Sequence, residues 1–249
     1  MIRVENLSLR AGHFALDSIS FEIPSGRYGV LMGRTGVGKT TLLESLCGLR
    51  QVTAGRIWLG DREVTNLKPA ERGIGFVPQD AALFDTMSVR EHLGFALAIR
   101  KAKRPAIEAR VAELAELLGI EKLLERRPHG LSGGERQRVA LGRALSAHPT
   151  ILCMDEPLSA LDEATRDEMY ALLESVRSKA GVTTLHITHN RAEAVRLADV
   201  VLLLENGTIR SLSRDELQNG NGVAQQRAPR ESSLLSPRGR GAGGEGVRD

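Results

Sequence analysis

The sequence has few of the features that define several whole classes of protein. Only two of its 249 residues are cysteine, and Cys47 and Cys153 stand in apolar surroundings without a second thiol at metal-ligand spacing. A disulfide scaffold is therefore excluded, and two buried free thiols are expected. The longest aliphatic run, 200–204, has five residues, whereas a membrane-spanning helix needs about 20. The first residues lack the basic start and apolar segment of a secretory signal, so we expect a chain that stays in the cytosol.

Charge is nearly balanced, with 34 Lys and Arg against 31 Asp and Glu, and part of the small excess lies near the end of the chain. Residues 221–249 carry five arginines against three acids, together with six glycines and no aromatic residue. Such a segment buries too little apolar area to offset chain entropy. We therefore expect a folded domain over 1–219 and a disordered Gly/Arg-rich tail over 220–249. The basic excess belongs mostly to that tail, so nucleic acid is not an expected partner.

Hydrophobic periodicity predicts an α/β protein. Apolar residues alternate over 2–9 and 14–23, which indicates an antiparallel strand pair, and a second pair is expected at about 56–59 and 73–77. Apolar residues at helical spacing over 107–118 indicate that about 89–146 forms a helical subdomain. Strands and helices alternate again from Thr150 to Leu204, as in a mostly parallel sheet covered on both faces.

A glycine-rich turn between an apolar strand (28–32) and a predicted helix matches the pattern Gly-x4-Gly-Lys-Ser/Thr. In such a turn, consecutive backbone N–H groups cradle phosphate at a helix N-terminus. Lys39 is expected to reach the β- and γ-phosphates, and the Thr40 hydroxyl to bind Mg²⁺. The predicted ATP-binding residues are Gly33, Arg34, Thr35, Gly36, Val37, Gly38, Lys39, Thr40 and Thr41.

Two adjacent acids follow the apolar strand 151–154. Side chains alternate along a strand, so Asp155 and Glu156 are expected to face different places at the carboxyl edge of the sheet. Asp155 is the better candidate for holding Mg²⁺. Glu156 is then free to accept a proton from an attacking water as general base.

The segment 131–137, Leu-Ser-Gly-Gly-Glu-Arg-Gln, resembles the signature sequence of ABC-transporter ATPase subunits. Gln79 is similar to the Q-loop glutamine of that family, the segment 159–162 to its D-loop, and His189 to its switch histidine. Together with the phosphate loop and the acidic pair, these four motifs make six sequence elements in the family's order, and the resemblance covers about 3–218. The resemblance implies a P-loop NTPase core with a mostly parallel sheet, an N-terminal antiparallel β subdomain and an inserted α-helical subdomain.

The resemblance also implies how the site is assembled. Ser132, Gly133 and Gly134 would open a helix aimed at phosphate, and one γ-phosphate cannot lie at two helix N-termini of one copy. The family's answer is a head-to-tail dimer of two copies, or of this chain with a homologous ATPase, that encloses two ATP molecules. His189 would then contact the γ-phosphate and the water, Gln79 would contact Mg²⁺ or the water, and Asp162 the opposite subunit.

Two departures from the family pattern stand out. Family members usually stack an aromatic residue on adenine at the position of Ala11, so His13 or Phe14 is expected to substitute here. The longer importer subunits add a C-terminal β-barrel regulatory domain, for which the expected tail is too short.

The family includes importers, exporters, tandem ATPases and repair ATPases. One phosphate loop, no long coiled-coil insert and no fused membrane domain disfavour the other classes, and 83–93 is similar to bacterial importer subunits for anions, metal ions, polyamines and sugars. We therefore expect an ATPase at the cytoplasmic face of a membrane, bound to permease subunits and served indirectly by a solute-binding protein. The alternative is a soluble ATPase of this type that acts on nucleic acid or ribosomes.

Overall fold

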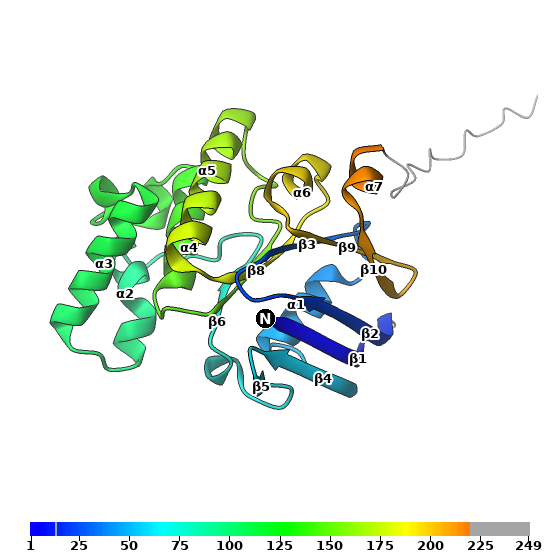
Figure 1. Cartoon of the computed structure of the whole chain (residues 1–249). Coiled ribbons are helices and arrows are strands. Elements are labelled where there is room, and N and C mark those ends of the chain that lie inside the picture. Colours follow the sequence, from blue (N-terminus) through cyan, green and yellow to red (C-terminus); the bar gives the residue numbers. More distant parts are fainter. Residues whose placement is uncertain (13, 220–249) are drawn as a thin grey trace, which may run out of the picture.

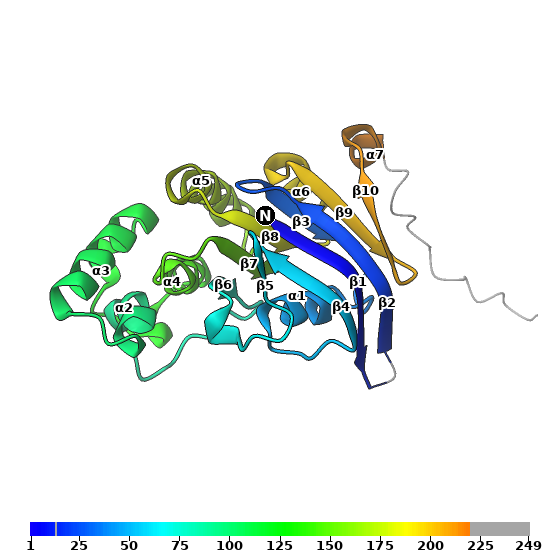
Figure 2. The ribbon, with the colours of Figure 1, turned by 60° about the horizontal axis from the view of Figure 1, so that its bottom comes forward.

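The computed structural model describes residues 1–12 and 14–219. Two β-sheets lie beside an arm of helices (Figure 1), and the second view separates the sheets more clearly (Figure 2). The expected tail, 220–249, lies outside the described residues.

The smaller sheet is antiparallel and has the strand order β2-β1-β4-β5. Its long strands alternate buried and exposed residues, as a sheet with one covered face requires. Its strands are β1 (Ile2–Ala11), β2 (Phe14–Ile23), β4 (Ala54–Leu59) and β5 (Arg62–Glu63).

The larger sheet has the order β10-β9-β3-β8-β7-β6, and all its pairs are parallel except β9 with β10. Its central strands are buried along their whole length, because helices cover both faces. Its strands are β3 (Tyr28–Met32), β6 (Ile74–Val77), β7 (Ile151–Asp155), β8 (Thr183–Ile187), β9 (Val200–Glu205) and β10 (Thr208–Leu212). The second strand pair expected from the sequence is wrong, because β4 pairs with β1 whereas β6 pairs with β7.

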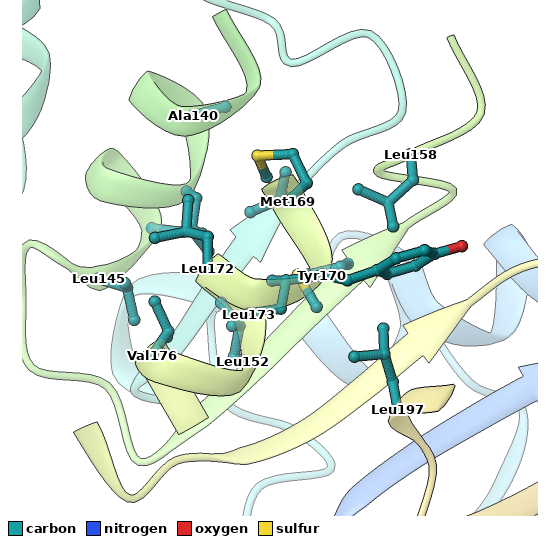
Figure 3. Packing of buried hydrophobic residues seen from close by; sticks show 14 of the residues in the cluster. Ala140, Leu145, Leu152, Leu158, Met169, Tyr170, Leu172, Leu173, Val176 and Leu197 are labelled. Atoms are coloured by element: carbon teal, nitrogen blue, oxygen red, sulfur yellow. The ribbon is translucent and has the colours of Figure 1, made fainter. Parts of the chain in front are cut away.

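The buried apolar side chains form two separate clusters. One contains α1 (Lys39–Cys47) with side chains from both sheets, so this helix lies between them (Figure 2). The other lies on the opposite face of the larger sheet, beneath α4 (Gly133–Leu145), α5 (Glu163–Ala180), α6 (Arg191–Leu197) and α7 (Arg214–Asn219). In Figure 3, Leu172 and Val176 of α5 lie between α4 and the sheet, and Tyr170 lies beside Leu158 and Leu197.

The helical arm consists of α2 (Val89–Ile99), α3 (Arg104–Leu118) and α4, which pack on one another. Helix α2 begins at a capping box in which the Ser88 side chain accepts from Glu91 N–H and the Glu91 carboxylate accepts from Ser88 N–H. Gly94 and Gly142 allow close packing, because a Cβ at Gly142 would lie 2.3 Å from Leu93 Cδ2 and one at Gly94 would lie 2.8 Å from Ile107 Cγ2. The expected α/β fold, with its antiparallel sheet and inserted helices, is confirmed.

Candidate functional site

The phosphate loop leaves the carboxyl end of β3 and turns directly into α1. Gly33 has φ +152°, and a Cβ there would lie 2.5 Å from the backbone oxygen of Leu204. Gly38, the N-cap of α1, has φ +99°, and a Cβ there would lie 2.1 Å from the Phe14 ring. Only glycine fits these two positions, so the loop can pass close to β9 and turn its backbone toward a ligand.

Lys39 stands at the start of α1 and is buried, with 6% of its surface exposed. Its Nζ donates to the backbone oxygens of Gly33 at 2.9 Å and Arg34 at 3.0 Å, so the ammonium lies across its own loop. Burial lowers the pKa of Lys39, while the nearby carboxylates of Glu156 and Asp155 act in the opposite direction. An anion in the loop would supply the charge partner that this ammonium lacks there.

Asp155, the last residue of β7, is also buried. Burial raises the pKa of its carboxyl, and a hydrogen bond with the Thr40 side chain partly opposes that effect. Within the part of the chain that the structure describes, its Oδ1 atom has no hydrogen-bond partner. A buried carboxylate oxygen left open beside a hydroxyl is the hard oxygen donor set that Mg²⁺ prefers, so Thr40 and Asp155 fit this ion.

The described residues hold no cluster of three or more His, Cys, Asp or Glu side chains suited to a metal. Mg²⁺ usually takes only one or two carboxylates from a protein and completes its shell with water and substrate phosphates. The pair Thr40 and Asp155 therefore fits what a protein usually contributes to a magnesium site.

Glu156 has the left-handed backbone value φ +42°, which is uncommon for a residue with a side chain. Its N–H donates to Ile187 O at 2.9 Å, and its own carbonyl accepts from the Ser159 N–H at 3.2 Å and hydroxyl at 2.9 Å. This bend turns the Glu156 side chain to His189, whose Nδ1 lies 3.1 Å from Oε2. The strained position thus brings two candidate catalytic groups together.

A cavity of about 500 Å³ opens beside the phosphate loop and Glu156, and neither Asp155 nor His189 is among the residues that line it. Gln79 enters it from the segment after β6, whereas Ala11 and Phe14 enter from the turn of β1 and β2. Its lining residues are Ala11, Phe14, Thr35, Gly36, Gly38, Lys39, Thr40, Thr41, Gln79 and Glu156. Of the two residues expected to replace the adenine-stacking aromatic, Phe14 therefore lines the cavity, and His13 lies outside the described residues.

Three residues of the predicted ATP-binding set, Gly33, Arg34 and Val37, do not line this cavity. Gly33 accepts a hydrogen bond from Lys39 through its backbone oxygen. Val37 packs on the core between the sheets, and Arg34 is exposed. Arg34 contributes its backbone oxygen to Lys39.

Ser132 is the N-cap of α4 and lies outside the cavity. Its N–H donates to Glu135 Oε2 at 2.7 Å, and its hydroxyl accepts from Glu135 N–H at 3.3 Å. Ser132 and Gly133 are exposed, and none of Ser132, Gly133 and Gly134 lines the cavity. Within one copy, the structure does not bring the signature residues to the phosphate loop.

Asp162 is the N-cap of α5 and is exposed. Its Oδ1 accepts from Thr165 N–H at 3.0 Å and its Oδ2 from Thr165 Oγ1 at 2.7 Å. The backbone hydrogen bond from Thr165 lowers the pKa of this carboxyl. Gly134 packs on the same threonine, since a Cβ at Gly134 would lie 2.5 Å from Thr165 Cγ2. The start of the signature helix and the D-loop therefore lie side by side, because both contact Thr165.

Comparison with known proteins identifies the family of this site. The model of the family described as ABC transporter matches residues 16–159, which include the phosphate loop, Gln79, the signature and the acidic pair. The chain belongs to the ABC transporter family.

Several curated proteins resemble this cassette over most of its length. The molybdate/tungstate import ATP-binding protein WtpC of Thermococcus kodakarensis is 41% identical over 209 residues, covering 84% of this chain and 63% of that protein. The probable sulfate/thiosulfate import ATP-binding protein CysA of Chlorella vulgaris is 44% identical over 209 residues, covering 84% and 89%. The chain thus spans nearly all of one relative but less than two thirds of the other.

Solved ABC cassettes share the fold. A dimeric ATP-binding cassette bound to ADP and Pi in a post-hydrolysis state superposes with a TM-score of 0.76 and is 26% identical, covering 86% of this chain and 99% of that one. A dimeric bacterial ABC transporter cassette matches with the same TM-score at 27% identity. Among the described residues of this cassette, no helix is both long and apolar enough to cross a membrane.

Three buried polar residues of the cassette were not predicted from its sequence. His186 lies in β8, Glu193 lies on the core face of α6, and Tyr28 begins β3. Their polar atoms approach one another in the core, and His189 lies between β8 and α6 in the sequence. The only signal in the sequence is that ionisable residues stand at positions that the apolar pattern assigns to the core.

Proposed function

We propose that this chain is the ATP-binding and ATP-hydrolysing subunit of an ABC importer, built as an ATPase domain over 1–219. One observation carries the proposal. Residues of the phosphate loop, Glu156 and Gln79 line one cavity, whereas Ser132 at the start of α4 is exposed and does not line it. A site whose second anion-binding helix faces outward is completed by a second copy arranged head to tail.

In this proposal each copy contributes different groups to each of two ATP molecules. Backbone N–H groups of 33–40 and the Lys39 ammonium hold the β- and γ-phosphates, and Phe14 borders the adenine end of the cavity. Ser132, Gly133 and Gly134 of the partner copy present a hydroxyl and backbone N–H groups to the γ-phosphate from the other side. Closure of the dimer is thus coupled to ATP binding, since ATP contacts both copies.

Hydrolysis follows from the pair at the cavity edge. The Glu156 carboxylate accepts a proton from water as the water oxygen attacks the γ-phosphorus, and the bond to the ADP oxygen breaks. His189, fixed on the Glu156 carboxylate, faces the γ-phosphate. Mg²⁺ held by Thr40 and Asp155, with Gln79 beside it, would neutralise charge on the phosphate oxygens. Once phosphate is released, the contacts across the dimer weaken and the two copies reopen.

A groove of about 260 Å³ between β6 and the helical arm supports docking of a permease close to Gln79. Phe84 is 44% exposed and borders the groove together with Phe95 and Arg143. Arg143 donates to the backbone oxygens of Ala81 and Ala82 and lies over the Phe84 ring, so this wall is held firmly. The segment after Gln79 therefore joins the nucleotide cavity to the groove. Docking there would hold the chain at the cytoplasmic face of the membrane.

The names of the relatives favour the importer over the soluble alternative. They are described as import ATP-binding proteins for molybdate and tungstate, for sulfate and thiosulfate, and for sn-glycerol-3-phosphate. Contacts with cargo belong to the permease and to the solute-binding protein, so we assign no cargo to this chain.

Mixing two inactive variants tests the shared site. Lys39→Ala disables the phosphate loop, and Ser132→Phe disables the signature. A mixed dimer of these two chains has one site with both defects and one site with neither. If half of the dimers are mixed, we expect about a quarter of wild-type ATPase activity to return. The proposal fails if the wild-type chain does not hydrolyse ATP, and its dimer arrangement fails if mixing restores nothing while each variant stays folded.

Association with a membrane tests the importer assignment separately. We expect the chain to be recovered from detergent-solubilised membranes together with a membrane-spanning protein. Phe84→Asp should weaken that recovery without changing ATP binding. Salt-sensitive association with RNA or DNA instead would favour the soluble alternative.

A further inference from the structure

Beneath the switch histidine lies a row of polar side chains in the apolar interior. Tyr28, His186 and Glu193 are 2%, 0% and 2% exposed. They come from three elements: β8 and α6 follow each other in the sequence, whereas β3 lies far from both. Burying three polar side chains costs free energy unless each of them is paired. Their presence in an apolar core therefore calls for an explanation.

The contacts form a continuous chain. Tyr28 Oη lies 2.9 Å from His186 Nδ1, and His186 Nε2 lies 3.3 Å from Glu193 Oε2. Among the described residues, no group makes a well-aligned hydrogen bond with Nε2, so the contact with Glu193 is a close electrostatic one. A proton on Nε2 would point the ring N–H toward the carboxylate, and Nδ1 would then accept from the Tyr28 hydroxyl.

Glu193 connects this row to the switch segment. Its carboxylate also lies beside the Thr188 side chain, whose hydrogen bonding is one of the causes that lower the pKa of Glu193. Burial acts to raise the pKa of Glu193, but the contacts with His186 and Thr188 outweigh it and the pKa lies below its usual value. Arg166 and Tyr170 of α5 face the same carboxylate. The buried group therefore carries a negative charge at neutral pH.

Hydrogen bonds of Thr188 and Asn190 fix the backbone on both sides of His189. The Thr188 hydroxyl accepts from Asn190 N–H at 2.9 Å, and Thr188 N–H donates to Leu31 O at 3.2 Å. Asn190 is the N-cap of α6, and its Oδ1 accepts from Ala192 N–H at 2.9 Å. His189 is thus held on both sides, while its own side chain stays exposed and reaches Glu156.

We propose that Glu193 and Thr188 are positioning residues for the candidate catalytic histidine, and that His186 and Tyr28 tie them to the strand that leads into the phosphate loop. Glu193 holds the Thr188 hydroxyl, and this hydroxyl fixes the backbone on which His189 faces Glu156. The inference rests on the proposed function, because the geometry of His189 matters only if this residue acts on bound ATP.

Two substitutions at Thr188 test this link with little change in volume. Thr188→Val removes the hydroxyl, whereas Thr188→Ser keeps it. We expect Thr188→Val to lower kcat for ATP hydrolysis by about 10- to 100-fold, because a small displacement of a reacting group costs that much. The KM for ATP should stay within about twofold, since the phosphate loop is untouched, and Thr188→Ser should retain most of the wild-type kcat.

Glu193→Gln tests the anchor itself, with Glu174→Gln as the matched control. Glu174 lies on α5, is largely exposed and makes only a 3.7 Å ion pair with Arg196, so its change should leave kcat unaltered. Combination with His189→Ala distinguishes positioning from a general loss of structure. If Glu193 acts through His189, Glu193→Gln should lower kcat no further in the His189→Ala background. Additive losses in the double variant would overturn the inference.

The ring signals of His189 provide a measurement that does not depend on activity. In the full chain with isotope-labelled histidine, the His189 signals are assigned by comparison with His189→Ala. We expect them to shift in Glu193→Gln and in Thr188→Val but not in Thr188→Ser or Glu174→Gln. Unchanged signals in both Glu193→Gln and Thr188→Val would overturn the inference. A wild-type chain without ATPase activity would instead overturn the proposed function and leave this measurement to decide the positioning role.

Discussion

Glu156 Oε2 lies 3.1 Å from His189 Nδ1, although the two residues are 33 positions apart in the sequence. Glu156 reaches this contact through a left-handed backbone bend directly after β7, and His189 reaches it directly after the neighbouring strand β8. Parallel strands end at the same sheet edge, so two residues that follow adjacent strands meet there. The relationship places a carboxylate and an imidazole together at the rim of the nucleotide cavity.

Glu156→Gln should keep ATP binding and lose turnover. The amide preserves the shape of the side chain but cannot accept the proton of the attacking water. We expect kcat to fall by about 10² to 10⁴, the usual range for a general base, with ATP affinity nearly unchanged. Steady-state hydrolysis together with equilibrium binding of ATP measures both quantities. Wild-type turnover in this variant would remove Glu156 from the mechanism.

Asp155→Asn should stabilise the nucleotide-free chain while abolishing Mg²⁺-dependent hydrolysis. Burial raises the pKa of Asp155, so the fold favours the protonated form, and the free energy of unfolding decreases as the pH rises above the usual range of an aspartate. Asparagine removes that charge. We expect a gain of ~1 kcal/mol, equivalent to about 2–4 °C in Tm at pH 8. Near pH 4 the difference from wild type should shrink, and thermal unfolding at the two pH values without nucleotide checks this. Lower stability at pH 8 would contradict the prediction.

Gly134→Ala should destabilise the start of the signature helix, whereas Gly133→Ala should not. A Cβ at Gly134 would lie 2.5 Å from Thr165 Cγ2, but one at Gly133 would find only Leu161 Cδ2 at an ordinary 3.8 Å. Overpacking at Gly134 should lower the free energy of unfolding by about 1–3 kcal/mol. Denaturant unfolding of the two variants makes the comparison. Equal stability would show that Thr165 moves aside without cost.

Removal of residues 220–249 should leave ATPase activity intact. This prediction comes from composition alone, since the segment is rich in glycine and arginine and lacks aromatic residues. The shortened chain should unfold in one cooperative transition at nearly the wild-type temperature, as measured by calorimetry. Cooperative loss of folding would show that the tail is structural.

Local sequence was sufficient for much of this site. Its main signals are carried by residues that are neighbours in the sequence. They are glycines at positions that tolerate no Cβ, a lysine at the start of α1 and two acids after an apolar strand. They predicted the phosphate loop and the acidic strand end, and the family's motif order predicted the α/β cassette that the comparisons confirm. Strand pairing was less accessible, because β4 and β6 are close in the chain and yet belong to different sheets.

By itself, the sequence determined the elements, the chemistry of the phosphate loop and the family. The tertiary structure decided which distant groups meet. It placed Glu156 beside His189, left an oxygen of Asp155 without a hydrogen bond among the described residues, kept Ser132 out of the cavity that the phosphate loop lines and joined Tyr28 to His186 in the core. The physical reason is that hydrophobic and glycine patterns act over a few residues, whereas the pairing of buried polar atoms depends on how the sheet and its helices come together.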